Sequence, residues 1–236
     1  MVSSSCRYSS KEQNINWIVR AVFGVCIIYA HWCVIPTHAF TFKASMFLST
    51  NMILAYIPVE ISLHMNSRTP SVVFWTLFPL WLLFYPNAPY MITDFFHLAK
   101  FDPYIIAESG RPTSLLLPDI GMWAAYTVLT TCILVAVAFG VWSIEHVTDS
   151  MLDRIGARRR LLWKIVLVAS ISALAGIGIY LGRFPRMHSV HLFLRTRWAF
   201  EQMAAACGKE MLAFTGLMTI VQMTIWGLFK VLRRAP

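Results

Sequence analysis

The chain has 236 residues, of which 58% are hydrophobic and only 13% are charged, and its formal net charge is +9. Soluble domains carry roughly 25% charged residues, so this composition excludes a soluble protein. It predicts an all-α, polytopic bundle of membrane-spanning helices. The positive charge would suit nucleic acid, but the basic residues lie between apolar segments and indicate attraction to anionic lipid instead. We expect a lipid bilayer and no nucleic acid as partner.

Six apolar segments are long enough, or nearly so, to cross a hydrocarbon core of ~30 Å as helices. An even number of spans places both termini on one side. Basic residues, including Arg158, Arg159 and Arg160, are more frequent on that side, so the positive-inside rule predicts cytoplasmic termini in a bacterial inner membrane. One integral membrane domain over residues 1–236 is expected. The predicted spans cover residues 17–35, 44–64, 71–91, 121–144, 162–183 and 211–232.

The second predicted span contains an amide in its outer third and a carboxylate nearer the cytoplasmic end. Asn51 either forms a hydrogen bond to another helix or belongs to a site, because a buried amide needs partners. Glu60 precedes His64 by four residues. Intramembrane carboxylates are functional candidates by default, but a Glu60–His64 pair would satisfy this one without a functional role.

The third predicted span breaks near its outer end. Pro86 and Pro89 each remove a backbone donor, which ends the helix and starts a new turn. Irregular backbone at membrane depth is tolerated only where it is buried in protein or lines a cavity. The polar side chains of Asn87 and Tyr90 in this stretch are therefore candidates for binding a substrate.

In the continuation of this span, Tyr90, Asp94 and His97 are spaced i, i+4, i+7 and would share one face of an α-helix. A carboxylate one turn before an imidazole can fix its tautomer and make it a better base. Asp94 and His97 are thus predicted as a catalytic pair. The alternative is a helix that simply ends at the water interface. Beyond it we expect a loop of about twenty residues, up to Pro118.

Two further features lie next to the fourth span. Asp119 begins that span, where a carboxylate either binds substrate or caps the helix through its dipole. After the span, a charged and helical connection is expected over residues 145–160 on the inner side.

The fifth predicted span ends in two basic residues. Gly178 and Gly182 form a small-xxx-small face that allows another helix to approach closely. Arg183 and Arg186 follow, one turn apart, and could hold a phosphate or carboxylate. The alternative is that both arginines snorkel to lipid headgroups.

After the fifth span, residues 186–210 mix apolar and charged side chains and are expected to lie along the outer membrane surface as an interfacial helix. His188 and His191 repeat the i, i+3 spacing of Asp94 and His97. These four residues would permit a zinc site as an alternative. No H-E-x-x-H motif occurs, so no metal is expected, and the sequence names no cofactor.

Three blocks of sequence form a recognisable set: Asn51-x-x-Leu54-Ala55-Tyr56-Ile57-Pro58, Pro86-Asn87-Ala88-Pro89-Tyr90-x-x-Thr93-Asp94-x-x-His97-Leu98 and Gly178-Ile179-Tyr180-Leu181-Gly182-Arg183-Phe184-x-Arg186. The set resembles a bacterial family of polytopic membrane proteins known as domain of unknown function 1361. The similarity runs from about Asn51 to Leu192. It implies a bacterial membrane protein but supplies no activity.

The leading functional prediction is a membrane enzyme with an outward-facing polar pocket. It would act on a lipid-linked or envelope substrate that carries an anionic group, with proton transfer by Asp94 and His97. The alternative is a non-catalytic transporter, or an assembly or accessory subunit that binds lipid or a partner protein in the same pocket. The predicted substrate-binding residues are Arg183, Arg186, Asn87, Tyr90, Asn51 and Asp119.

Overall fold

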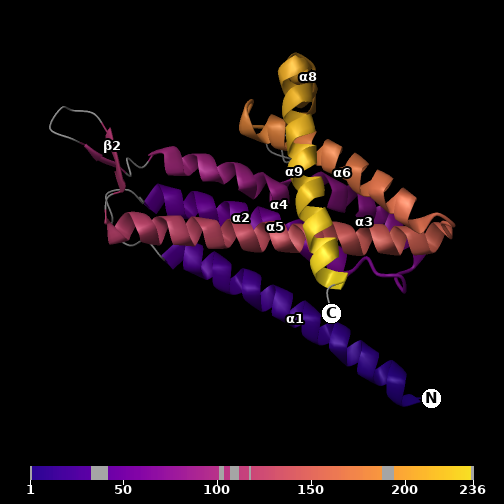
Figure 1. Cartoon of the computed structure of the whole chain (residues 1–236). Coiled ribbons are helices and arrows are strands. Elements are labelled where there is room, and N and C mark those ends of the chain that lie inside the picture. The colour runs from indigo at the N-terminus through magenta and orange to yellow at the C-terminus, as the bar shows by residue number, and fades with distance from the viewer. Residues whose placement is uncertain are drawn as a thin grey trace. The chain divides into compact units, whose positions relative to one another are not determined.

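The computed structural model describes residues 2–32, 42–100, 104–106, 112–116, 118–187 and 194–234, shown in Figure 1. Its chain is almost entirely helical, with one short antiparallel pair of strands. The helices are α1 (Val2–Trp32), α2 (Phe42–Leu63), α3 (Ser71–Phe84), α4 (Asn87–Tyr90), the 3-10 helix η1 (Met91–Lys100), α5 (Ile120–Ile155), α6 (Arg160–Arg183), α8 (Thr196–Ala206) and α9 (Lys209–Arg234), and the strands are β1 (Tyr104–Ile106) and β2 (Pro112–Leu116).

Six helical segments are long and apolar enough to cross a membrane. This confirms the predicted all-α class and the number of spans. The segments are Asn14–His31, Met46–Leu63, Ser71–Leu98, Ile120–Ile155, Arg160–Arg183 and Lys209–Arg233.

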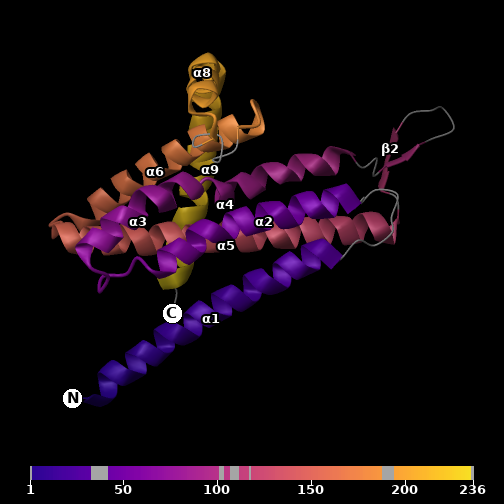
Figure 2. The same cartoon turned by 180° about the vertical axis from the view of Figure 1, so that it is seen from behind.

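The chain forms two compact units, each built from two stretches of sequence. Unit 1 consists of Met1–Ile53 and Met91–Ala136, and unit 2 of Leu54–Tyr90 and Val137–Pro236. In unit 1, η1 and the beginnings of α2 and α5 run side by side in Figures 1 and 2. The helix α1 in the same unit buries a stripe of residues spaced four, three and four apart: Val19, Phe23, Cys26 and Ala30.

The third span is broken where the prolines predict it. Helix α3 ends at Phe84, and α4 is a single turn in which the Tyr90 amide donates to the Pro86 carbonyl at 2.9 Å. The chain then continues as η1, a ten-residue 3-10 helix. Runs of 3-10 helix beyond three or four residues are uncommon and often mark functional segments.

The 3-10 geometry changes two sequence expectations. A 3-10 helix aligns residues three apart, so the α-helical spacing of Tyr90 and Asp94 does not place them on one face, whereas Asp94 and His97 remain aligned. The expected loop from His97 to Pro118 is also shorter, because η1 extends to Lys100 and the strands β1 and β2 pair within it.

Helix α5 has 36 residues, which is roughly 54 Å at 1.5 Å per residue, well beyond a hydrocarbon core. The connection predicted over residues 145–160 is therefore mostly the last three turns of α5. The helix ends at a left-handed Gly156 with φ of 60°, and the Ala157 amide bonds back to the Leu152 carbonyl at 3.4 Å. This is the Schellman pattern, in which glycine avoids the steric cost of positive φ.

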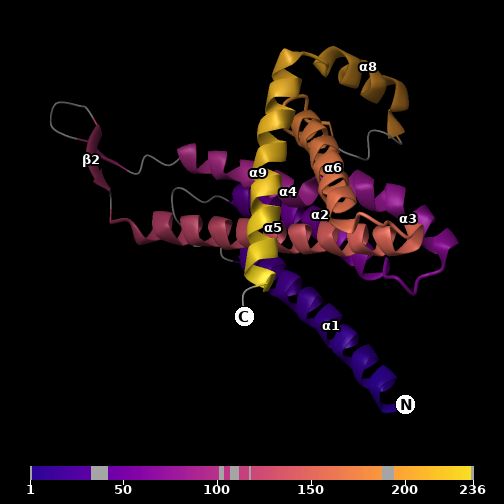
Figure 3. The ribbon, with the colours of Figure 1, turned by 45° about the vertical axis from the view of Figure 1, so that its right-hand side comes forward.

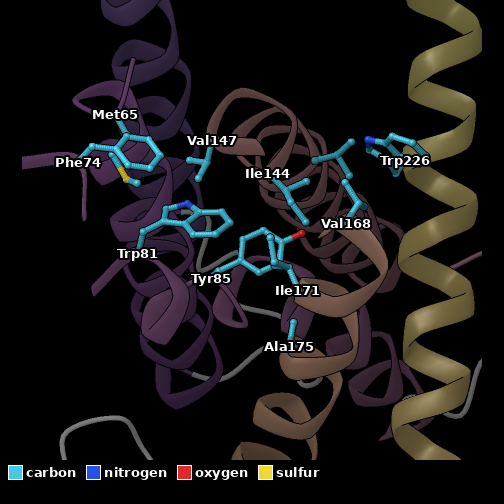
Figure 4. Packing of buried hydrophobic residues seen from close by; sticks show 11 residues of the cluster. Met65, Phe74, Trp81, Tyr85, Ile144, Val147, Val168, Ile171, Ala175 and Trp226 are labelled. Carbon is cyan, nitrogen blue, oxygen red and sulfur yellow. The ribbon is translucent and has the colours of Figure 1, made fainter. Parts of the chain in front are cut away.

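The core of unit 2 lies between α3, α5 and α6, as Figure 4 shows. Trp81 is fully buried, and its indole nitrogen donates to the Ser143 hydroxyl at 2.9 Å. Ser143 in turn donates to the Pro58 carbonyl at 3.4 Å, which links α3, α5 and α2. Lipid is as apolar as these side chains, so packing and such interhelical hydrogen bonds hold the helices together.

Helix α9 packs along α6 in unit 2, and Figure 3 shows the two side by side. A methyl group on Gly176 of α6 would lie 3.1 Å from the Thr215 backbone of α9, so the two helices approach very closely. Nearby, the buried Gln222 amide donates to the Ser172 carbonyl at 3.1 Å. The close approach and the hydrogen bond together fix this helix pair.

The predicted outer helix is α8. Its Ala199 is fully buried against a small apolar cluster with Leu181 and Met187, at the end of α6. Phe200 is 60% exposed on the other face, and Arg197 pairs with Glu201 at 3.0 Å. One apolar and one charged face suit a helix that lies on a membrane surface.

Candidate functional site

In unit 1 the structure brings together three of the predicted site residues, Asn51, Asp94 and His97. The Asp94 side chain is 0% exposed, and the Asn51 amide donates to its Oδ2 at 2.9 Å. The Nε2 atom of His97 lies 3.8 Å from Oδ1 of Asp94. His97 remains 33% exposed, so the imidazole is accessible while the carboxylate behind it is not.

The local structure explains this arrangement. In the 3-10 helix η1, Asp94 and His97 lie on one face because they are three residues apart. Helix α2 meets that face twice, through Asn51 and, one turn earlier, through Phe47, whose ring centroid lies 5.0 Å from that of His97. A buried carboxylate in a membrane needs such donors to offset its lost hydration.

This group of residues can perform proton transfer. An accessible imidazole backed by a carboxylate is a standard general acid or base, because the carboxylate orients the ring and stabilises its cationic form. At 3.8 Å the contact is an ion-pair distance, longer than a hydrogen bond. Catalytic contacts of this kind often tighten only when substrate binds.

Asn51 and Asp119 both have a structural role where substrate binding was predicted. The Asn51 amide is used by Asp94, which is the cross-helix hydrogen bond considered from the sequence. Asp119 is exposed and accepts a hydrogen bond from the Gly121 amide at 2.9 Å. That contact caps the start of α5, as the alternative for Asp119 proposed.

In unit 2 the broken segment around α4 is held in place by glycines on two neighbouring helices. A methyl group on Gly178 of α6 would lie 2.9 Å from Pro86 Cγ, and one on Gly140 of α5 would lie 2.8 Å from Ala88 Cβ. These distances confirm the predicted close approach at the small face of α6. The side-chain amide of Asn87 donates to the Phe84 carbonyl at 2.8 Å and so satisfies an acceptor freed by the helix break.

The structure also brings together Tyr90 and Arg183, two of the predicted substrate-binding residues. An Arg183 guanidinium nitrogen donates to the Tyr90 hydroxyl at 3.4 Å, and its central carbon lies 5.8 Å from the ring centroid. A methyl group on Gly182 would lie 3.5 Å from the same ring. The aromatic ring positions the guanidinium of Arg183. Because Arg183 is only half-buried, its charge remains partly accessible.

Arg186 does not continue this arrangement. Helix α6 ends at Arg183, so the two guanidiniums are not on successive turns of one helix as the spacing predicted. Arg186 is exposed and has a positive φ of 54°, which few residues other than glycine adopt. The next amide, that of Met187, bonds back to the Leu181 carbonyl at 3.0 Å and closes the turn.

Glu60 is satisfied by one residue of α2 and by the residue that directly follows this helix. It accepts a hydrogen bond from the Tyr56 hydroxyl and lies 3.2 Å from His64 Nε2. The Glu60–His64 pair considered from the sequence is thus present.

The zinc alternative involves residues of which only two are described. Among the residues that the structure describes, no group of three or more potential ligands could hold a metal ion. His188 and His191 lie outside the described residues, so the four-residue set remains an untested prediction.

Sequence reasoning missed a cluster of charges in unit 2, buried at one end and exposed at the other, which we call the charge zipper. It pairs three acidic residues of α5 with three basic residues of α6 and α9. The residues from α5 are four apart, as are those from α6, and therefore share a face of their helix, and α9 contributes one residue. The members are Glu145, Asp149, Asp153, Arg160, Lys164 and Lys230.

Glu145 is the centre of the zipper, with a side chain only 3% exposed. Its Oε1 lies 2.7 Å from Lys164 and 2.8 Å from Lys230, and its Oε2 accepts from the Trp226 indole at 2.7 Å. Both carboxylate oxygens are thus satisfied. Figure 4 shows Trp226 on α9, facing the α5 and α6 side chains of the core.

Toward the α5–α6 turn the zipper becomes more exposed. Asp149 lies 2.6 Å from Lys164 and 3.2 Å from Arg160, and Asp153 pairs with Arg160 at 2.5 Å. The i, i+4, i+8 spacing of the acids was visible in the sequence. It was not interpreted as buried because the apolar run ends at Ile144.

Comparison with known families agrees with the three sequence blocks. The family described as protein of unknown function (DUF1361) matches residues 50–225. The chain belongs to this family. The DUF1361 match covers the broken third span, Asp94, His97 and the zipper residues of α5 and α6, but neither Lys230 nor α1. Neither a curated protein nor a solved structure matches the chain.

Proposed function

We propose that this DUF1361 protein is a membrane enzyme in which His97 transfers a proton to or from a lipid-linked or envelope substrate. The observation that carries the proposal is the contrast within unit 1 between a fully buried Asp94 and a one-third exposed His97, 3.8 Å apart. The imidazole can reach a substrate, and the carboxylate can act only through it. Asp94 is therefore the positioning residue and His97 the catalytic residue.

The structural cost of this arrangement favours a functional role. A carboxylate buried among apolar helices is expensive, and a Leu or Val at position 94 would pack without needing Asn51. Intramembrane ionisable residues with a named partner are functional candidates for this reason. The unusual length of η1, which sets the Asp94–His97 alignment, points the same way.

We also propose, from unit 2 alone, that Arg183 holds an anionic group. A guanidinium resting on an aromatic ring is fixed in position and can still donate to a phosphate or carboxylate. Tyr90 serves as the platform for this guanidinium. Arg186 is a weaker candidate, because it lies beyond the end of α6.

The proposed location is the cytoplasmic membrane of a bacterium, with both termini in the cytoplasm. The concentration of basic residues at the α5–α6 turn and near the C-terminus supports this orientation. The orientation is tested by fusing to the C-terminus either a reporter that is active only in the cytoplasm or one that is active only in the periplasm. Signal from the periplasmic reporter alone would contradict a cytoplasmic C-terminus.

The function is tested in the host by lipid and envelope profiling of three variants: Asp94→Asn, His97→Ala and Arg183→Ala. Asp94→Asn and His97→Ala are expected to accumulate the same unprocessed species, because both act in one reaction, and Arg183→Ala tests anion binding in unit 2 separately. His64→Ala is the control, since that histidine is paired with Glu60 on α2 and has no proposed role. Normal profiles in all three variants, at normal protein levels, would rule out the enzyme and leave a binding or assembly role.

A further inference from the structure

The charge zipper divides the cations at the α5–α6 turn into two classes. Arg160 is paired with Asp149 and Asp153, and Lys164 is paired with Glu145 and Asp149. The acids of this end of α5 are therefore used within the protein, and the zipper as a whole is neutral, with three acids and three bases.

Arg158 and Arg159 are the cations that the zipper leaves out. Both are exposed in the turn between α5 and α6, and neither pairs with an acidic group among the described residues. The turn is fixed on one side by the left-handed Gly156 and on the other by the first hydrogen bond of α6, from Trp163 to Arg159. Two unneutralised guanidiniums are thus presented together at one end of unit 2, where α5 and α6 meet in Figure 1.

The residues that follow are apolar and exposed. Leu161 is 58% exposed, and Leu162 and Trp163 are 52% exposed each. Trp163 lies one helical turn after Arg159 and so shares its face. Tryptophan next to arginine, at the end of an apolar helix, is the pattern of side chains at the headgroup level of a bilayer.

We propose that Arg158, Arg159 and Trp163 bind the headgroups of anionic phospholipids. The two guanidiniums donate to the phosphate and the indole lies at the boundary between headgroups and acyl chains. The occupant is the lipid surface itself, because the free cations stand beside exposed apolar side chains rather than in a polar cleft. This proposal does not depend on the activity proposed for His97.

The test uses the full chain, purified in a neutral detergent, and measures Tm while a short-chain lipid is added. Dioctanoyl phosphatidylglycerol is expected to raise Tm of the wild-type protein, and dioctanoyl phosphatidylcholine to raise it less. The double variant R158Q/R159Q should bind the anionic lipid roughly thirtyfold more weakly, because each basic residue near an anionic surface contributes about 1 kcal/mol and about 1.4 kcal/mol is a factor of ten.

Two variants separate charge from folding. R158K/R159K keeps both charges and should retain most of the response to phosphatidylglycerol. R160Q removes a zipper cation, so it should lower the starting Tm and leave the affinity for phosphatidylglycerol unchanged.

Two results would overturn the proposal. One is an equal loss of the phosphatidylglycerol response in R160Q and in R158Q/R159Q. This would mean that lipid binding depends on the total charge of the protein and not on Arg158 and Arg159. The other is inorganic phosphate raising Tm as much as the lipid does, which would assign the arginines to a soluble anion.

Discussion

The amide of Asn51 on α2 donates to the carboxylate of Asp94 on η1 at 2.9 Å, across 43 residues of sequence. This hydrogen bond supports the proposed pair of Asp94 and His97, because it fixes Oδ2 of Asp94 while Oδ1 is the oxygen nearer to His97. The carboxylate is fully buried, so the loss of this donor cannot be compensated by bulk water.

Replacing Asn51 by Ala should therefore lower the free energy of unfolding by about 1–3 kcal/mol, the cost of an unsatisfied buried acceptor. Thermal melting of the purified protein measures this. Thr50→Ala is the matched control, since the neighbouring Thr50 is exposed and bonds only to the Met46 carbonyl of its own helix. Equal melting temperatures for the two variants would mean that Asn51 does not support Asp94.

The packing of the broken segment predicts a difference between two glycines of one helix. Gly178→Ala should destabilise unit 2 by about 1–3 kcal/mol, because its methyl group would overlap Pro86 at 2.9 Å. Gly182→Ala should be tolerated, because its methyl group would meet the Tyr90 ring at an ordinary 3.5 Å. Thermal melting of both variants gives the comparison. A larger drop in melting temperature for Gly182→Ala than for Gly178→Ala would be incompatible with this packing.

Much of the fold follows from the sequence, because the physical cause of each feature is local. Apolar length predicts the six spans, and the missing donors of Pro86 and Pro89 predict the end of α3. Gly178 and Gly182 predict a close approach because their spacing matches one helical face. None of these features requires knowledge of which distant residue is the partner.

What could not be predicted depends on partners far apart in the chain or on a change of helix type. Nothing in residues 91–100 distinguishes a 3-10 helix from an α-helix, because the i, i+3 spacing of Asp94 and His97 suits both. The sequence does not decide between a cross-helix hydrogen bond and a site role for Asn51, since its acceptor lies on another helix. Hydropathy places the acids of the charge zipper outside the membrane, because it ends a span at the first charge and does not detect Lys164 or Lys230 opposite.

The charge zipper makes its own prediction. Glu145→Gln should destabilise the protein by about 3–5 kcal/mol, because it removes the carboxylate shared by the buried Lys164 and the partly buried Lys230. Thermal melting is again the measurement. Asp153→Asn, at a side chain 42% exposed, is the control and should change stability by about 1 kcal/mol or less. A Glu145→Gln variant as stable as wild type would show that the zipper does not hold α9.

Tyr90 and Arg183 can be separated by conservative changes. Tyr90→Phe keeps the aromatic platform and removes the long hydrogen bond of 3.4 Å from Arg183, so host lipid profiles should stay close to wild type. Arg183→Lys keeps the charge but loses the planar group that lies over the ring, and it should reproduce much of the Arg183→Ala profile. An Arg183→Lys variant with a wild-type lipid profile would mean that Arg183 contributes only its positive charge and not its planar guanidinium.

Proton transfer at His97 is tested most directly by chemical rescue. Membranes containing His97→Gly should be unable to convert the species that accumulates in the host variant, and added imidazole should restore conversion by occupying the vacated space beside Asp94. The same addition should not rescue His97→Gly combined with Asp94→Asn, because the base would lack its orienting carboxylate. Full conversion by His97→Gly membranes without imidazole would contradict the proposed role of His97.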